Sequence, residues 1–329
     1  MDTFNLRKVI LEYPQQIHWG QKFAGKITSP SEKTSYNNLI VCGMGGSALP
    51  AEILADYLFF EEKSSLPIHI CRDYQLPPYA NKKSLIFISS YSGNTEETIS
   101  CFHEALKRKL PIVAFAAGGK VEQLAKKNHV PLVKYKINFP NFQPRYAAGY
   151  GVVAMLEVLT KYGILATMPR IPKIDSREKE IPGEDLAKKI KGTLPIFYAS
   201  NRFRAVAQNW KIKVNENAKT PAFWNVFPEL NHNEMVGMTL PQCPMSVIFL
   251  SAEDENPAIQ KRIAITEKLF QVKGLATEKV SLEGKNYWEK VFNSLVLGDW
   301  VSYYLALEYE QDPTPVIMVE DFKKALNQS

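Results

Sequence analysis

Long apolar runs and concentrated positive charge are both missing from this sequence. No run is long enough to span a bilayer, and the segment Met1–Asn5 lacks the basic and then apolar pattern of a secretion signal. The formal net charge of +6 is spread along the chain, without a dense Lys/Arg block or an aromatic–basic ladder. We therefore predict a cytoplasmic protein with no membrane and no nucleic-acid partner, whose modest positive charge favours an anionic metabolite.

Cysteine and histidine are also scarce, with four and five residues in a chain of 329. Cys42, Cys71, Cys101 and Cys243 have neither the spacing of a metal site nor that of a redox pair. The histidines are scattered, which argues against a zinc site built from them. We expect free thiols in a reducing compartment and no bound metal.

The remaining composition, 45% apolar and 22% charged, is typical of a globular protein, and the length favours two domains. In the first half, strand patterns alternate with helical patterns, which predicts an α/β fold with a parallel sheet covered on both faces. The expected strands are 39–42, 68–71, 85–89, 112–115 and 132–137. A proline-rich, charged linker at 166–190 would separate a first domain, 1–165, from a second, 191–329.

The second half repeats the pattern of the first. Leu194–Asn201 resembles the first strand and its turn, and Ser246–Ser251 resembles the strand at 85–89, which predicts a duplicated α/β unit. The second copy continues into Ala252–Glu255, whose three carboxylates would repel a phosphate. We therefore expect an anion site in the first unit only. A long helix over 286–309 carries an aromatic stripe that is expected to form core or a dimer interface.

The segment Ser89–Thr98 is the strongest candidate for a binding site. It follows an apolar strand pattern and opens a helical one, and Ser90, Ser92 and Thr95 flank the glycine at position 93. Backbone N–H groups and the positive end of a helix dipole at such a turn favour an anion such as phosphate. Ser, Thr and Asn are also the usual helix caps. These residues alone therefore leave phosphate binding and simple capping equally open.

A second loop, Gly43–Ala48, also follows a strand and opens a helix. It matches the loose dinucleotide pattern G-x-G-x-x-G/A, for which Asp73 would be a late candidate for the ribose ligand. A dinucleotide site needs one glycine loop and gives no role to the hydroxyl-rich loop. A monophosphate site uses both, because several N–H and O–H donors can then surround one dianion. We therefore favour a sugar phosphate over a dinucleotide.

This pair of loops resembles those of the sugar isomerase (SIS) domain family, in which such loops hold a sugar phosphate and the domain is typically duplicated. The wider set of motifs is similar to the bifunctional phosphoglucose/phosphomannose isomerases known from archaea and some bacteria. The set covers nearly the whole chain and comprises Gly43–Ala48, Ser90–Thr98, Gln143–Ala147, Asn215–Lys219, Pro228–Glu234 and Asp312–Val316. The resemblance implies two SIS-type units, each a doubly wound parallel sheet with helices on both faces, and no cofactor.

The resemblance also implies roles for individual residues. Arg145 would stabilise the enediolate, and Glu216 would act as the base. His232 would open the sugar ring, and it would reach the site from the partner subunit of a homodimer. The phosphate would be bound by Gly46, Ser47, Ser90, Ser92 and Thr95.

The chemistry of these residues is compatible with the implied roles but does not select them. A guanidinium stays charged at any working pH, and the alternative for Arg145 is a plain surface arginine, since most arginines are exposed. Glu229 and Glu234 compete with Glu216 for the role of the base. An imidazole titrates in the right range for ring opening, and the run around His232 is too polar for a packing role.

At the C-terminal end, the resemblance implies that Thr314 makes room for either epimer at C2 and that Lys323, or else Lys324, serves ring chemistry. The implied activity is a metal-independent interconversion of glucose 6-phosphate, and mannose 6-phosphate, with fructose 6-phosphate through a cis-enediol. The alternatives are a non-catalytic sugar-phosphate sensor, a nucleotide-linked oxidoreductase that uses Gly43–Ala48, and an amido-transferring synthase. A helix-turn-helix segment and an N-terminal cysteine nucleophile domain, which a transcriptional sensor and such a synthase need, are not evident.

Overall fold

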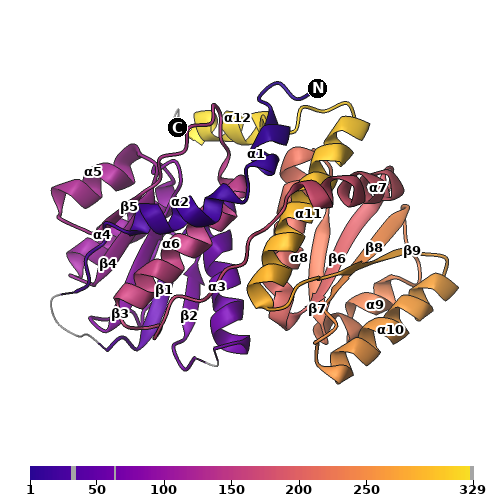
Figure 1. The fold of residues 1–329 in the computed structure, drawn as a ribbon, viewed down its shortest axis with the longest axis horizontal. Helices are drawn as coiled ribbons and strands as arrows, with labels where there is room; N and C mark the ends of the chain where they lie inside the picture. The colour runs from indigo at the N-terminus through magenta and orange to yellow at the C-terminus, as the bar shows by residue number, and fades with distance from the viewer. Residues whose placement is uncertain (31–34, 63, 327–329) are drawn as a thin grey trace.

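The computed structural model describes residues 1–30, 35–62 and 64–326, which form two units side by side, each built on a parallel sheet (Figure 1). The first sheet has the strand order β2-β1-β3-β4-β5. Its strands are β1 (Asn38–Cys42), β2 (Ile68–Cys71), β3 (Ser84–Ser89), β4 (Ile112–Ala116) and β5 (Leu132–Lys134). The expected α/β fold is confirmed, and the last strand ends earlier than predicted.

Alternate residues of these strands enter two different apolar layers. Leu39 and Val41 face one layer of helices, and Ile40 and Cys42 face the other. Because both faces of the sheet are covered, its strands need apolar side chains at nearly every position, which is why the sequence pattern could identify them. The first layer contains α2 (Gln15–Ala24), α3 (Leu49–Phe60) and α6 (Ala148–Lys161), and the second contains α4 (Glu96–Lys107) and α5 (Gly119–Lys127).

The second sheet has the order β7-β6-β8-β9, which repeats the order β2-β1-β3-β4 of the first and confirms the expected duplication. Its strands are β6 (Leu194–Ser200), β7 (Phe223–Phe227), β8 (Met245–Ser251) and β9 (Ala276–Ser281). Helix α7, at Glu180–Ile190, lies inside the segment predicted as a linker. The other covering helices are α8 (Arg204–Asn217), α9 (Glu234–Gly237), α10 (Pro257–Val272) and α11 (Tyr287–Glu308).

Helix α11 forms the centre of the second unit. Trp288, Phe292 and Trp300 on this helix are buried within the chain, where α11 packs against α7 and α8. The aromatic stripe predicted at 286–309 is therefore core, and these rings are not available to a second subunit.

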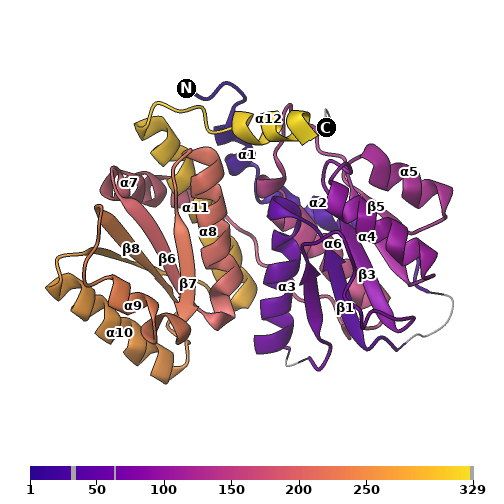
Figure 2. The same cartoon turned by 180° about the vertical axis from the view of Figure 1, so that it is seen from behind.

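The strands of the first sheet run in the opposite direction to those of the second. Arg145, beyond the carboxyl end of the first sheet, contacts Glu216, which lies at the end of α8 beside the amino end of the second sheet. Conversely, Arg202, just after β6, contacts Glu61, where α3 has run back to the amino end of the first sheet. Figure 2 shows this arrangement from behind, with α3 and α8 between the sheets. The carboxyl ends of the two sheets, where α/β proteins bind ligands, therefore lie at opposite ends of the molecule.

The two terminal helices lie on the same side of the molecule. Helices α1 (Leu6–Leu11) and α12 (Ile317–Leu326) lie together at the top of both views (Figures 1 and 2). The backbone N–H of Thr3 donates to the carboxylate of Asp312 at 3.3 Å. Among the described residues, no helix combines the length and the apolar character that a membrane crossing requires.

Candidate active site

Both predicted binding loops lie at the topological switch point of the first sheet. In the order β2-β1-β3-β4-β5, β2 is added on one side of β1 and the later strands on the other, so the switch point lies between the parallel strands β1 and β3. Ligands of such sheets bind outside the carboxyl ends of those two strands. The loop at 43–47 follows β1, and the loop at 90–95 follows β3. The fold therefore brings to one place two loops that are more than forty residues apart in the sequence.

Direct hydrogen bonds join the two loops. The Ser47 hydroxyl oxygen accepts the backbone N–H of Tyr91 at 3.0 Å, and the Ser89 hydroxyl donates to the Ser47 carbonyl at 2.8 Å. Gly43 also approaches this strand end so closely that a Cβ atom on it would lie 2.8 Å from the Ser89 carbonyl oxygen. The loops thus converge as the sequence predicted.

The hydroxyls of the second loop bond within the loop. Ser90 and Thr95 share a hydrogen bond of 2.9 Å between their hydroxyls, and Ser90 also accepts the N–H of Gly93 at 3.1 Å. Gly93 has a φ of 72°, a conformation that favours glycine. Thr95 stands in the capping position of α4, yet its side chain makes no capping bond. Simple capping therefore does not account for this cluster of hydroxyls.

Arg145 connects the first loop to the second unit. It lies in the short 3₁₀ segment Pro144–Tyr146, and a Cβ atom on Gly46 would come within 2.6 Å of the Arg145 backbone nitrogen. Only glycine therefore allows this approach. Arg145 is 1% exposed, which excludes the alternative of a surface arginine.

The Arg145 guanidinium is held by groups from two segments, the last turn of α8 and the C-terminal segment at 313–314. Nη1 donates to Glu216 Oε2 at 3.0 Å, and Nε donates to Asn217 Oδ1 at 2.6 Å, both on the last turn of α8. Nη2 donates to the carbonyl oxygens of Pro313 and Thr314 at 2.9 and 2.8 Å. This buried cation therefore fixes the relative positions of the first loop, Glu216 and the C-terminal segment.

The three glutamates that competed for the role of the base lie in different places. Glu216 pairs with Arg145, and 31% of its side chain is exposed. Glu229 accepts a hydrogen bond from Asn233, and Glu234 accepts one from Tyr198 at 2.5 Å, both beyond the carboxyl end of β7. Of the three, Glu216 alone is beside the loops in the described structure.

Lys219 is a site residue that the sequence analysis missed. It follows α8 with a φ of 57°, and its ammonium donates to the carbonyl oxygens of Glu216 at 2.6 Å and Pro313 at 3.3 Å. Desolvation, together with the positive charge of Arg145, lowers the pKa of Lys219 to about 8. One signal for it was present, since a lysine just past a helix can bind the last carbonyls.

A buried ion pair supports α8 from behind and was also missed. Lys213 on α8 pairs with Asp299 on α11, and both side chains are almost fully buried. Burial lowers the pKa of Lys213 and raises the pKa of Asp299. Next to them, Asn217 Nδ2 donates to the Ser302 hydroxyl at 2.8 Å. These contacts fix the turn of α8 that carries Glu216.

The predicted C-terminal residues lie at different distances from this centre. Thr314 is buried, and its carbonyl contacts Arg145, but its hydroxyl has no hydrogen-bond partner among the described residues. An unsatisfied hydroxyl in such a place can accept a ligand contact. Lys323 and Lys324 lie further along, on the exposed helix α12, where Lys324 pairs with Asp321 at 3.1 Å.

His232 lies at the other end of the second sheet. Glu216 precedes β7 and His232 follows it, so the length of this strand, about 17 Å at about 3.3 Å per residue, separates them. His232 is exposed, as the polar run around it predicted. Within one chain, this imidazole does not join Arg145 and Glu216.

Comparison with known proteins supports a common origin over the whole chain. The family model described as the bacterial phospho-glucose isomerase C-terminal SIS domain matches residues 179–326. A bifunctional phosphoglucose/phosphomannose isomerase of Caldicellulosiruptor bescii is 32% identical, over 96% of this chain and 97% of its own. The protein of the same name from Aquifex aeolicus is 32% identical over 97% of each chain. A D-glucosamine-6-phosphate 4-epimerase of Sulfolobus acidocaldarius is 30% identical, over 77% of this chain and 85% of its own.

Solved structures share the architecture. The glucosamine-6-phosphate deaminase of Thermotoga maritima has a TM-score of 0.65 at 16% identity, over 93% of this chain and 96% of that chain. The tagatose-6-phosphate ketose/aldose isomerase of Escherichia coli has a TM-score of 0.64 at 14% identity, over 93% of each. At these identities the likeness concerns the fold, and it agrees with the predicted pair of α/β units.

Proposed function

Because this chain belongs to the family of bifunctional phosphoglucose/phosphomannose isomerases, we propose that it interconverts glucose 6-phosphate, and also mannose 6-phosphate, with fructose 6-phosphate. The observation that carries the proposal is the contact between Arg145 and Glu216 beside two hydroxyl-bearing loops at a topological switch point. The isomerases among its relatives favour catalysis over the sensor alternative.

The phosphate occupies the loops after β1 and β3 in this proposal. Gly46, Ser47, Ser90, Ser92 and Thr95 supply N–H and O–H donors, and the end of α4 adds a partial positive charge. The anchored phosphate directs the far end of an open-chain sugar toward the second unit. Holding the sugar in this way removes most of the entropy cost of bringing its first two carbons to Glu216.

Glu216 and Arg145 then divide the chemistry. Glu216 removes the proton from C2 of the aldose, the C1 carbonyl oxygen takes up a proton, and a cis-enediol forms. Return of a proton to C1 and loss of one from the C2 hydroxyl give the ketose. Arg145 binds Oε2 of Glu216, while Oε1 has no hydrogen bond among the described residues and is available as the base. The buried guanidinium stabilises the enediolate charge without a metal ion.

One carboxylate can serve both aldoses, because glucose 6-phosphate and mannose 6-phosphate differ only at C2 and share the enediol. The hydroxyl of Thr314, which has no partner within the described chain, lies in the segment that would have to accept either epimer. Lys323 on α12 is proposed to assist ring chemistry, with Lys324 as the alternative.

Ring opening requires a second subunit in this proposal. His232 lies too far from Glu216 within one chain, so a homodimer would supply it from the partner. Its exposed position is compatible with such a contact. The thiols of Cys42, Cys71 and Cys101, all free, fit a protein of the reducing cytoplasm.

Replacement of Glu216 by Gln tests the assignment. We expect Glu216→Gln to lower turnover of fructose 6-phosphate by about 10²–10⁴-fold, because the base is lost, while binding of the sugar phosphate persists. Glu229→Gln is the matched control and should keep full turnover. Equal activity of the two variants would remove Glu216 from the mechanism.

The same assay separates the other functions. Binding of fructose 6-phosphate by the unaltered protein without conversion would indicate a sensor. Because one relative is a 4-epimerase, glucosamine 6-phosphate should be offered as a second substrate. Conversion of that sugar, and not of fructose 6-phosphate, would place this chain with the epimerase in activity.

A further inference from the structure

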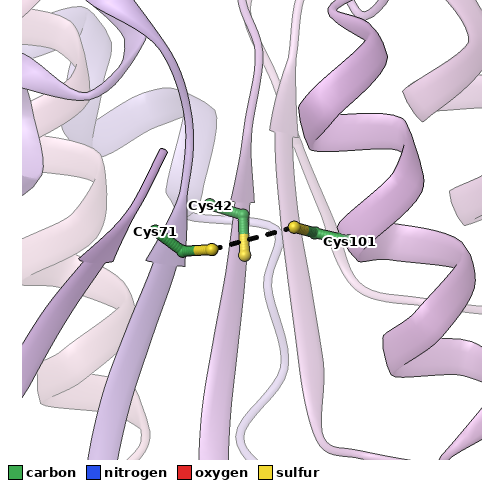
Figure 3. A group of neighbouring side chains, drawn as sticks. All are labelled: Cys42, Cys71 and Cys101. Carbon is green, nitrogen blue, oxygen red and sulfur yellow. Dashed lines mark hydrogen bonds between the residues drawn. The ribbon is translucent and has the colours of Figure 1, made fainter. Parts of the chain in front are cut away.

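Three of the four cysteines meet in the core of the first unit (Figure 3). Cys42 ends β1 and Cys71 ends β2, and the two are partners in the parallel register, so their side chains leave the same face of the sheet. Cys101 on α4 packs against that face. The sequence spacing concealed this group, because the three residues come from three elements that only the fold brings together.

The sulfur atoms have the separations of a metal site. All three Sγ atoms lie within 4.8 Å of one another, and those of Cys71 and Cys101 are 3.9 Å apart. Three thiolates that bind one ion at about 2.3 Å in tetrahedral directions are about 3.8 Å from one another. Small side-chain movements would therefore let all three contact a single ion.

The surroundings favour a soft ion. The three side chains are at most 4% exposed and lie among apolar groups such as Ile40, Ile88 and Phe102. In the loop after β2, the carbonyl oxygens of Asp73 and Gln75 accept hydrogen bonds from the thiols of Cys101 and Cys71 at 3.2 and 3.1 Å, and metal binding would replace these bonds. Among the residues that the structure describes, no carboxylate oxygen joins the group, so hard cations such as Mg²⁺ are poorly matched.

We propose that Cys42, Cys71 and Cys101 form a three-sulfur site for a soft d¹⁰ metal ion, zinc(II) or copper(I). Binding converts three thiols to thiolates and releases three protons, and no oxidant or reductant is needed. The site leaves a net charge of −1 with zinc(II) and −2 with copper(I).

The ion would have a structural role beside the phosphate loops. Cys42 directly precedes Gly43, where the first loop begins, and Cys101 lies on α4, which follows the second loop. A bound ion would link β1, β2 and α4 and so stabilise the base on which both loops rest. This proposal does not depend on the isomerase assignment, because the hydrogen bonds of Cys71 and Cys101 go to each other and to the carbonyls of Gln75 and Asp73, which are not among the residues proposed to bind the sugar.

Metal binding to the reduced full-length protein tests the site. The metal-free protein is mixed with zinc(II) or copper(I), dialysed and analysed for metal content, and cobalt(II) serves as a spectroscopic substitute for zinc(II). We expect one ion per chain and, with cobalt(II), absorption bands of thiolate coordination. Retention of zinc(II) or of copper(I) identifies the ion. Retention of neither would overturn the proposal.

The decisive comparison uses two cysteine variants. Cys71→Ala removes the sulfur on the edge strand β2 and should abolish stoichiometric binding. Cys243→Ala removes the exposed cysteine of the second unit and should bind as the unaltered protein does. Equal binding by the two variants would show that the metal sits elsewhere and would overturn the site.

A measurement on the unaltered chain covers the case in which Cys71→Ala fails to fold. An ion that binds the folded chain alone must raise its thermal unfolding midpoint as the ion concentration increases. We expect such a rise in the unaltered chain and in Cys243→Ala. A midpoint that stays constant with both zinc(II) and copper(I) would rule out the site.

Discussion

The two sheets have the same strand order around their switch points, but the loops at those points differ in chemistry. After β1 and β3 the loops carry glycine and hydroxyl groups, and Ser47 bonds directly to the backbone of Tyr91. After β6 and β8 the equivalent loops carry Ser200 and Glu255, and the Ser200 hydroxyl donates to the Glu255 carboxylate at 2.5 Å. The same scaffold therefore presents donors to an anion at one end and a buried carboxylate at the other.

The second switch point has space but the wrong charge. A hollow of about 580 Å³ lies there, lined by residues that include Arg202, Asp254 and Glu255. Arg202 pairs with Glu61 of the first unit at 2.6 Å and with Asp254 at 3.2 Å, and Lys290 pairs with Asp254 at 2.6 Å. The cations there are already neutralised, and one of them holds the two units together. Topology thus offers a place for a ligand, and side chains decide whether it is used.

The largest difference between the two switch points is expected when the arginine at each of them is replaced. Arg145→Lys keeps the charge but loses the geometry that contacts Glu216, Asn217 and Thr314 together. We expect turnover to fall about 10²–10³-fold, the usual result of removing a transition-state donor. Arg202→Lys at the second switch point is the control and should retain turnover. Steady-state kinetics, with thermal unfolding to check folding, would detect a failure of this contrast.

The next largest effect is expected when a carboxylate, as found at the second switch point, is introduced at the first. Ser92→Asp adds a carboxylate to the loop that we propose binds the phosphate, and Ser92→Asn adds a neutral side chain of similar size. We expect Ser92→Asp to raise KM about 100-fold, because two like charges about 4 Å apart repel by about 1–4 kcal/mol. Ser92→Asn should raise KM much less. Similar KM values for the two variants would mean that the phosphate does not bind this loop.

A smaller effect is expected from Lys219, which binds backbone carbonyls beside Arg145, whereas Lys290 at the second switch point pairs with the carboxylate of Asp254. Its pKa of about 8 means that the ammonium loses its proton as pH rises through that value, and its charge-assisted bonds to the Glu216 and Pro313 carbonyls weaken. We expect kcat to fall about tenfold from pH 7 to pH 9, since loss of such a bond costs about 1.5 kcal/mol.

Lys219→Arg should remove this alkaline decrease, because a guanidinium stays protonated throughout the range. The measurement is the pH profile of kcat for both proteins. An alkaline limb at the same pH in Lys219→Arg would assign it to another group.

The smallest effect concerns the ion pairs at the second switch point. Asp254→Asn removes the negative partner of Arg202 and Lys290, but half of the Asp254 side chain is exposed to solvent. We expect a loss of about 0.5–1 kcal/mol in the free energy of unfolding and no change in turnover. Denaturant unfolding and the isomerase assay measure the two quantities. A large loss of turnover would show that this end also takes part in catalysis.

The fold was predictable because its strands are buried on both faces. Runs such as Leu85–Ile88 need no partner to be recognised, since a covered parallel strand must be apolar throughout. The glycine-and-hydroxyl loops were also evident, because the residues that make them lie next to one another in the chain. Each loop directly follows an expected parallel strand, and this position predicted that the two loops would converge.

The contacts between distant segments could not be predicted in this way. Nothing local shows that Arg145 reaches Glu216, that Lys219 folds back onto the carbonyl of Pro313, or that Cys101 meets Cys42. These contacts join residues that are distant along the chain. They depend on how the two units pack together and on how α4 lies on the first sheet.

The amino-acid sequence alone determined the architecture, the duplicated unit and the two loops, because each follows from the order and polarity of neighbouring residues. Residue types alone left Glu216, Glu229 and Glu234 equivalent, although the family resemblance selected Glu216. Only the tertiary structure placed Glu216 beside the loops, buried Arg145, and put His232 at the far end of β7. The physical reason is that charge pairing and burial depend on distances in space. Those distances are set by how the two units pack through α3 and α8, which the local pattern of each strand and helix does not determine.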